Sequence, residues 1–527
     1  MDVSFNYKLS ILKNSLLIGF ILVAISSGFD LEKGFNPQTK EITTRFFSDP
    51  LIDIPTPAFQ KKKGASTYGE VIEFIQNTVE SHAEYAELAS LGTSQKGLNI
   101  PIIFLRSPTA KNPLRIWFQG GLHGDEIGSV ESMLFLLHEL LTDSVHLLEQ
   151  AEFAIVPVAN PDGFSKEDRF SANGLDLNRD QTKMLAPETE FLKDAFHSFA
   201  PEIAVDFHEY RPYRKDYVNY GRAGITSPYD AMFLHTSNEN VPEDLRKMIH
   251  RQFVLPAMDK MEEAGYRTSG YFSTVDIQGK THFRLGSASA RSTSTSYALS
   301  NTISSLIEIR GVGISTTSLK RRVHSAFLIG MSYIHEGIRL GKGLKEFLHE
   351  RAAIEKATVL VSYNRRMDTL RFIDLDKVEV QDFYLPIQDL SRQSVDISRV
   401  LPQAYLILGK DIKEVESRLN LLNIQCSRKQ LSELPIERLR AYAVDNYSMD
   451  GTLYEGSKMQ NLTCHLEPLD AKEYSVKQEV LFIPVDQPRM GHLVELLEPD
   501  APNSLFSFSI IQLTASKTIN ILRYEKG

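Results

Sequence analysis

The chain has 527 residues, of which 42% are hydrophobic and 24% are charged, so it is long enough for two domains and at least one large hydrophobic core. The formal net charge of −9 is spread along the chain without a basic stripe, which excludes nucleic acid as an expected partner. Cys426 and Cys464 are too few for a disulfide scaffold or a cysteine-rich zinc module, and the sequence leaves open whether they pair.

Residues 1–27 have the three-part layout of a secretory signal peptide. Two lysines precede an apolar run, and small residues follow it in "LLIGFILVAISSGFD". The run is shorter than the about 20 apolar residues that a membrane-spanning helix needs, so we expect cleavage near Ser26 to Gly28. The alternative is an uncleaved N-terminal anchor. We therefore predict a periplasmic or secreted protein with no other attachment to a membrane.

Residues 28–65 are polar, contain prolines and lack sustained periodicity, which predicts a linker or a segment draped over the surface. From residue 66 to about 350, helical and strand patterns alternate. The expected helices span 67–82, 129–141 and 187–199, and the expected strands span 99–107, 114–120, 152–160, 202–210 and 304–311. The alternation predicts an α/β domain with a mixed, largely buried sheet flanked by helices, whose ligand site lies beyond the strand ends.

Possible metal ligands lie at the ends of two of these strands. His123 and Glu126 are three residues apart in the turn "GGLHGDEIGS", and His208 closes the strand "EIAVDF". A catalytic Zn²⁺ ion takes about three nitrogen or oxygen ligands from the protein and keeps one position open. The histidine and glutamate alone are a weak signal because such a spacing often arises by chance. With the distant histidine, they predict a site for one Zn²⁺ ion.

Several short motifs, in a fixed order, give this prediction its specificity. They are "HGDE", "NPDGF", a following arginine, "GLDLNR", the strand end "DFH" and "LIEIR". Together they resemble the zinc carboxypeptidase family, the carboxypeptidase A-like metallopeptidases. The resemblance covers about Ser66 to Gly343, and the later motifs "VDQP" and "LLEPDAPNSL" look similar to the C-terminal extensions of the larger bacterial members.

The resemblance implies a role for each matching residue of the catalytic machinery. His123, Glu126 and His208 match the zinc ligands, and Glu308 matches the glutamate that acts as general base. Arg169 matches the arginine that polarises the scissile carbonyl. These residue types also suit the chemistry, because a carboxylate can accept a proton from an attacking water and a guanidinium stabilises the negative charge that develops on the carbonyl oxygen.

The same resemblance implies a substrate-binding group and a residue that orients a ligand. Asn178 and Arg179 match the pair that grips a terminal carboxylate, and a planar guanidinium can make two parallel hydrogen bonds to such a group. Asp176 matches the aspartate that holds the first zinc histidine. Tyr297 is our choice for the family's mobile tyrosine, with Tyr271 as a rival.

Two departures from the family pattern, and one further arginine, concern substrate binding. Asp180 follows the "DLNR" motif and brings a negative charge close to the carboxylate grip. The charged loop "EYRPYRKDY" replaces the usual small polar residues after the third ligand and is expected to reshape the pocket. Arg291 would suit an acidic group of a substrate. Asp206, on the same strand face as His208, could orient that histidine as Asp176 orients the first.

Residues 351–527 predict a second, smaller, β-rich domain. Short apolar or alternating runs at 357–363, 369–375, 377–387, 404–409, 479–485 and 506–514 indicate strands, and 412–424 and 431–442 indicate helices. No constellation of chemically reactive residues is evident there, which favours a role in packing or in guiding substrate.

The expected function is that of a zinc metallocarboxypeptidase, a hydrolase that removes C-terminal residues from a peptide substrate. One alternative is a zinc amide hydrolase that acts on cell-wall stem peptides or N-acyl amino acids. A second alternative is a peptide-binding relative that has lost turnover. The presence of Glu308 and Arg169 argues against this second alternative.

Overall fold

The computed structural model describes residues 38–350, 354, 356–469, 478–513 and 518–526. The predicted signal peptide lies outside these residues. Within the predicted linker, Lys40–Phe46 (α3) and Pro57–Gln60 (α4) are helical, and the side chains of Phe47 and Ile54 are buried. The described part of this segment is therefore packed against the rest of the protein. No helix among the described residues is both long and apolar enough to cross a membrane.

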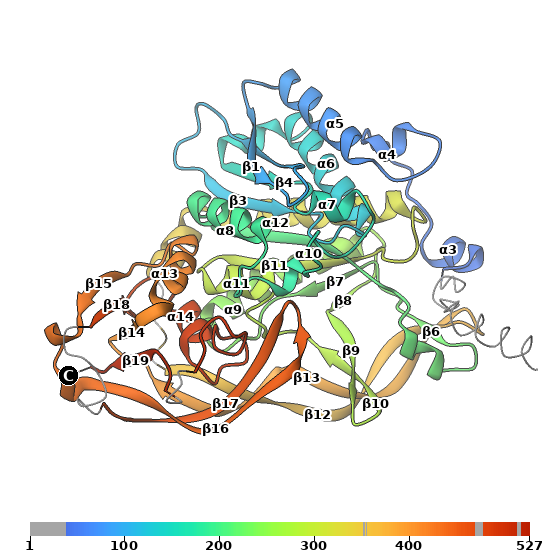
Figure 1. The fold of residues 1–527 in the computed structure, drawn as a ribbon. Coiled ribbons are helices and arrows are strands. Elements are labelled where there is room, and N and C mark those ends of the chain that lie inside the picture. The colour runs from blue at the N-terminus through green and yellow to red at the C-terminus, as the bar shows by residue number, and fades with distance from the viewer. Residues whose placement is uncertain (1–37, 351–353, 355, 470–477, 514–517, 527) are drawn as a thin grey trace, which may run out of the picture.

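An eight-stranded mixed sheet lies at the centre of the N-terminal half (Figure 1). Its strands, in spatial order, are β1 (Ala86–Thr93), β2 (Asn99–Leu105), β4 (Ala151–Val156), β3 (Leu114–Gln119), β5 (Ile203–Tyr210), β11 (Ile303–Arg310), β7 (Ala231–Leu234) and β8 (Thr268–Gly270). Strands β3, β5 and β11 are parallel neighbours, so their carboxyl ends meet at one edge. The predicted α/β class with a mixed, buried sheet is confirmed.

Helices cover both faces of this sheet. One face packs against α5 (Tyr68–Ser81), α6 (Ile127–Leu141), α9 (Glu243–Ile249), α10 (Leu255–Glu263) and α12 (Leu319–Glu350), and the other packs against α8 (Pro187–Phe199). Side chains alternate along β3 as the strand period requires, with Ile116 and Phe118 on the first face and Trp117 on the second. The central strands are thus buried on both sides.

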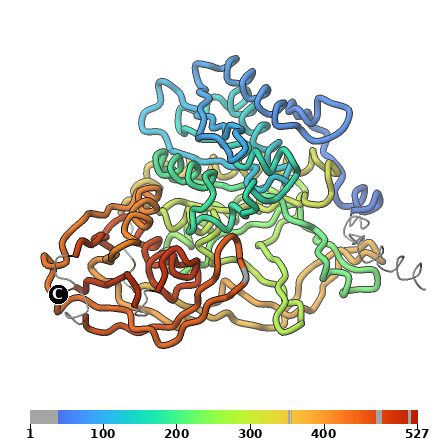
Figure 2. The backbone as a smooth tube through the Cα atoms, in the orientation of Figure 1, coloured from blue at the N-terminus to red at the C-terminus, as the bar shows by residue number. Residues whose placement is uncertain are grey.

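A five-stranded sheet combines strands from both sides of residue 350. Its order is β6 (Ile225–Thr226), β12 (Lys356–Asp374), β13 (Glu379–Val400), β10 (Lys280–Leu285) and β9 (Phe272–Ile277). The long β12–β13 ribbon runs beneath the main sheet toward β6 (Figures 1 and 2). Phe283 and Phe372 pack together from the two sides of the predicted domain boundary, with ring centroids 5.4 Å apart. The two parts therefore share a hydrophobic core.

The C-terminal region contains a six-stranded sheet, in agreement with the predicted β-rich character. Its strands are β15 (Ser427–Gln430), β18 (Glu479–Pro484), β14 (Ala404–Leu408), β19 (Ile521–Tyr524), β16 (Leu439–Tyr454) and β17 (Ser457–Pro468). Helices α13 (Ile412–Leu421) and α14 (Met490–Leu497) pack against its core. Cys426 and Cys464 are both free.

Shorter elements connect these layers. They are α7 (Pro161–Phe164), α11 (Thr293–Leu299), a π-helical turn at His250–Val254, and 3₁₀ turns at Val145–Glu149, Leu177–Arg179, Lys215–Asn219, Gly409–Asp411, Leu431–Glu433 and Ile436–Arg438.

Two predicted elements of the C-terminal region are wrong. The described residues of the expected strand at 506–514 form turns at 506–509 and then an irregular segment, without a strand. The expected helix at 431–442 is two 3₁₀ turns followed by the start of β16. Pro435 lies between the turns, and a proline in a helix interior removes a backbone hydrogen bond and clashes with the preceding turn. The strands expected at 357–363 and 369–375 are parts of one strand, β12, whose pairing shifts register near Tyr363.

Candidate active site

The candidate ligands come together at the carboxyl edge of the main sheet. His123 and Glu126 lie in the turn after β3, and His208 lies on β5. Glu308 on β11 is the direct register partner of His208, so both side chains point to the same side of the sheet. Gly124 permits the turn to lie close to α7, because a Cβ there would be 2.0 Å from the carbonyl carbon of Gly163.

Three ligand atoms converge in a buried cluster. The Nδ1 atom of His123 lies 2.6 Å from Oε1 of Glu126, and Nδ1 of His208 lies 2.9 Å from Oε2. The two Nδ1 atoms are 3.1 Å apart. Each side chain is at most 3% exposed. Two imidazole nitrogens and a carboxylate, aimed at one point, form a donor set that fits a divalent metal ion.

The other nitrogen of each histidine is held by an aspartate. Nε2 of His123 lies 3.1 Å from Oδ1 of Asp176, and Nε2 of His208 lies 2.8 Å from Oδ2 of Asp206. A carboxylate in this position fixes the tautomer, so that Nδ1 is left as the ligand atom, and raises the basicity of the ring. The two histidines are therefore oriented in the same way from two different parts of the chain.

Electrostatics within the cluster favour a cation. Burial raises the pKa of the Glu126 carboxyl, but the two histidines outweigh burial and hold that pKa below its ordinary value. Burial lowers the pKa of His208, but Asp206 and Glu126 raise it further, to well above its ordinary value. A cluster whose carboxylates attract protons onto its histidines also attracts a metal cation to the same point.

Glu308 differs from the other carboxylates of the cluster. Burial, together with the negative charge of Glu126, raises its pKa to about 7. Its Oε2 atom is buried and has no hydrogen-bond partner among the described residues. A carboxyl group that titrates near neutral pH and keeps a free oxygen beside possible metal ligands is suited to proton transfer.

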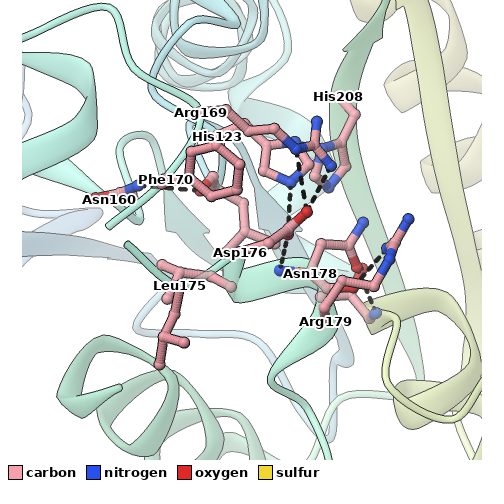
Figure 3. A network of polar contacts seen from close by, with 12 residues as sticks. His123, Asn160, Arg169, Phe170, Leu175, Asp176, Asn178, Arg179 and His208 are labelled. Carbon is pink, nitrogen blue, oxygen red and sulfur yellow. Dashed lines mark hydrogen bonds and ion pairs between the residues drawn. The ribbon is translucent and has the colours of Figure 1, made fainter. Parts of the chain in front are cut away.

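The loop after α7 contributes the two arginines (Figure 3). Arg169 donates from Nε and Nη2 to Oδ2 of Asp176, at 3.0 and 2.8 Å, and its Nη1 lies 3.8 Å from Oε1 of Glu126. Arg179 donates from Nη1 to the carbonyl oxygen of Asn178 at 2.7 Å. Asp176 therefore joins Arg169 to His123, while Arg179 has no ion pair with a described acidic residue.

These side chains open into a cleft of about 580 Å³. His123, Arg169, Arg179 and Glu308 line it, and so do residues of the charged loop predicted to reshape the pocket, including Arg214. Asp180 does not reach the cleft. It is fully buried and accepts hydrogen bonds from the backbone N–H groups of residues 185 and 186. The carboxylate of Asp180 is therefore not placed to neutralise the charge of Arg179, as the sequence had suggested.

Tyr297, predicted to bind substrate, does not line the cleft in this structure. Its side chain is 2% exposed, its ring stacks on Phe196 and its hydroxyl donates to Gln119 at 3.0 Å. The residue lies on α11, whose backbone turns this ring into the core behind the ligands. Tyr271, the rival, lines the cleft, and the negative charge of Glu308 adds to burial in raising its pKa.

Thr293 is a site residue that the sequence analysis missed. Its backbone N–H donates to Oδ1 of Asn178 at 2.9 Å, and its hydroxyl donates to Oδ2 of Asp206 at 2.5 Å. It thus links the loop that contains Asn178 to Asp206, the aspartate that holds His208. The available signal was the hydroxyl-rich run "RSTSTSY", all but the first residue of which is fully buried or nearly so.

Comparisons with known proteins identify relatives of this chain. Residues 71–314 match the family described as "Zinc carboxypeptidase". "Carboxypeptidase 2" of Trichophyton rubrum is 26% identical over 499 residues, covering 89% of this chain and 88% of that protein. "Carboxypeptidase 2" of Trichophyton tonsurans is 26% identical over 461 residues, covering 82% and 81%. A solved metallo-carboxypeptidase from Burkholderia cenocepacia is 16% identical, with a TM-score of 0.40, and the match covers 52% of this chain and 69% of that one.

Proposed function

Because residues 71–314 of this chain match the zinc carboxypeptidase family, we propose that the protein is a zinc-dependent metallocarboxypeptidase that removes residues from the free C-terminus of peptides. The observation that carries the proposal is the convergence of both histidine Nδ1 atoms and the Glu126 carboxylate beside Glu308. A secreted or periplasmic location, with residues 1–27 as signal peptide, stays a prediction from the sequence.

His123, Glu126 and His208 would hold the zinc ion. When bound, zinc would supply a Lewis acid that polarises a carbonyl group and makes a water molecule more acidic. Glu308 would accept a proton from the attacking water, and its pKa of about 7 lets it later give that proton to the departing amine. Its buried, unpartnered Oε2 supports this role.

Arg169 and the pair of Asn178 and Arg179 would act on the peptide itself. Arg169 lies between Asp176 and Glu126 at the edge of the cluster, where a guanidinium can stabilise negative charge on the scissile carbonyl oxygen. Arg179 faces the cleft without a carboxylate partner and can hold a terminal carboxylate in two hydrogen bonds. Tyr271 replaces Tyr297 as the tyrosine that would contact the substrate.

Two measurements test the proposal. Metal analysis of the purified protein should give about one zinc per chain, and a value near zero after reconstitution would refute the metal site. Peptides with a free C-terminus should be cleaved from that end, whereas the same peptides with an amidated end should be poor substrates, because the amide leaves Arg179 without its charged partner. Equal cleavage of both forms, or internal cleavage only, would favour the amide-hydrolase alternative.

Two variants make the second measurement specific. Arg179→Ala should weaken the preference for free over amidated ends more than Asn178→Ala does, because the alanine at 179 removes a charge as well as a hydrogen-bond donor. The amide of Asn178 is already engaged through Oδ1 by Thr293. An equal effect of the two variants would mean that Arg179 does not hold the terminal carboxylate.

A further inference from the structure

A second cavity adjoins the cleft beyond Arg179. It has a volume of about 360 Å³ and is lined in part by residues of the C-terminal region, among them Val361 and Glu495. Six residues line both spaces and so form the neck between them, namely Arg179, Tyr271, Ser273, Arg284, Ser287 and Ser292. A peptide whose terminal carboxylate is held at Arg179 can therefore place its last side chain in this neck.

The neck carries two arginines that lack acidic partners. Arg284 lies on β10, and its Nε donates to Oε1 of Gln388 at 3.1 Å. Gln388 is its register partner on β13, so the C-terminal region fixes the direction of this guanidinium. In the described part of the chain, neither Arg284 nor Arg179 forms an ion pair with a carboxylate, and the terminal nitrogens of Arg284 have no hydrogen-bond partner.

The other charges of the second cavity are already matched within the protein. Arg291 forms an ion pair with Glu455 and donates from Nε to Asn503 at 3.1 Å, so it is not free for a substrate as the sequence had suggested. The oxygens of Glu495 accept hydrogen bonds from three asparagine side chains. Burial raises the pKa of this carboxyl. The unmatched charge is thus positive and lies at the neck.

We propose that the neck and the second cavity accept an acidic C-terminal side chain, with Arg284 as the residue that determines this specificity. The proposal rests on the carboxypeptidase function proposed above. The guanidinium of Arg284 offers its free N–H groups to a carboxylate, whereas a neutral side chain of similar shape would leave them unpaired. A lysine or arginine side chain would bring its positive charge beside the guanidinium of Arg284, which has no carboxylate partner, and is disfavoured by like charge.

The test uses four peptides that differ only in the last residue, which is Glu, Gln, Leu or Lys, each with a free carboxylate. The wild-type protein should cleave the Glu peptide with a kcat/KM about tenfold or more above that of the Gln peptide, and the Lys peptide should be the poorest. If no peptide is cleaved, the proposed function fails. If the Leu, Gln or Lys peptide is cleaved as well as the Glu peptide, the function holds and the specificity proposal is overturned.

Arg284→Gln should abolish the advantage of the Glu peptide over the Gln peptide, and Arg284→Lys should restore part of that advantage. The control is Arg222→Gln, which removes an 86% exposed arginine that lines neither cavity and should leave the preference unchanged. A preserved Glu preference in Arg284→Gln would overturn the assignment. Should that variant not fold, Gln388→Leu frees the Nε of Arg284 and should reduce the same preference, and an unchanged ratio there would likewise overturn it.

Discussion

Asp176 contacts two of the residues on which the proposed chemistry depends. One oxygen accepts from His123 and the other accepts two hydrogen bonds from Arg169. Asp206 holds His208 in the same manner but touches no arginine, and its remaining contacts are with Gln119 and a threonine hydroxyl. Of the two aspartates, therefore, only Asp176 couples the proposed metal ligands to Arg169, the residue proposed to face the substrate carbonyl.

This difference predicts separable effects of two isosteric substitutions. Asp206→Asn and Asp176→Asn should each lower zinc affinity about 10- to 100-fold, measured by competition with a chelator, because each weakens the hydrogen bond that orients a histidine. At saturating zinc, Asp206→Asn should recover most of its kcat, whereas Asp176→Asn should not, because Arg169 has lost its charged partner. Equal recovery of kcat in both variants would mean that Arg169 does not contribute to catalysis.

Glu308→Gln should retain zinc and fold but lose activity. The substitution removes only the proton acceptor, and general-base catalysis contributes about 10²- to 10⁴-fold, so kcat should fall by that factor. Zinc content and the thermal midpoint provide the control, and both should match the wild-type protein. Full activity in this variant would require another base.

Some residue positions could be predicted from the sequence and others could not. His123 follows β3 and His208 lies near the carboxyl end of its parallel neighbour β5, so the two histidines could be expected to come together before any distance was known. The direction of the Asp180 side chain depends on the backbone of a short turn, and that of the Tyr297 side chain depends on the backbone of α11. The spacing of residues in the sequence does not determine either direction. A burial pattern cannot distinguish a tyrosine that lines a cleft from one that packs behind it.

At the scale of elements, helix α8 buries a charged group that the mechanism does not use. Lys193 is 1% exposed, its Nζ donates to Ser296 and lies 5.3 Å from the centroid of the Tyr297 ring. Burial lowers the pKa of this lysine to about 7, and the distant charge of Asp180 only partly opposes burial. The folded protein therefore disfavours the protonated form that the unfolded chain carries up to about pH 10.

Lys193→Met should stabilise the protein at neutral and lower pH. In the wild type the cost of burying the ammonium group is fully present below about pH 7 and disappears by about pH 10.5, so this group makes stability rise with pH across that window. The variant should gain on the order of a few kcal/mol at pH 6 and lack this rise. Denaturant unfolding at several pH values measures both effects, with the 59% exposed Lys260→Met as control. A loss of stability at pH 6 would contradict the expected cost.

Elements stabilised by local interactions could be predicted from the sequence better than elements stabilised by pairing with distant strands. Helix α5 carries a capping box of Thr67 and Glu70 and an apolar face, so both its start and its packing could be predicted from local sequence. The β16–β17 hairpin could not be predicted, and the β12–β13 ribbon could be predicted only as separate shorter strands, because the full length of these strands depends on pairing with distant parts of the chain.

At the scale of the whole molecule, the tip of the β16–β17 hairpin reaches the loop that carries the proposed substrate-binding residues. Glu455 at the tip accepts from Nζ of Lys183 through its backbone carbonyl at 3.0 Å and through Oε2 at 3.2 Å, and it also pairs with Arg291. A Cβ on the neighbouring Gly456 would lie 2.5 Å from a methyl group of Leu175. The C-terminal region thus supports the segment from Leu175 to Lys183, which contains Arg179.

Glu455→Gln should therefore weaken both the fold and substrate binding. The side chain of Lys183 is 1% exposed and that of Arg291 is 15% exposed, so the substitution leaves two largely buried cations without their carboxylate. Removing one member of a buried pair typically costs 3 to 5 kcal/mol, and the partial exposure of Glu455 reduces the expected loss to about 2 to 4 kcal/mol. KM for peptides with a free C-terminus should rise more than kcat falls, because the loop that holds Arg179 loosens while the metal ligands stay in place.

The control for this prediction is Glu379→Gln, which breaks the 3.9 Å contact with Arg45, where both side chains are more than half exposed. It should change the free energy of unfolding by less than about 0.5 kcal/mol. Adding Lys183→Met to Glu455→Gln should recover part of the lost stability, because one unpaired buried charge is then removed as well. Unchanged stability and unchanged KM in Glu455→Gln would mean that the hairpin contacts the loop without supporting it, and the C-terminal region would then act on the substrate through the wall of the second cavity alone.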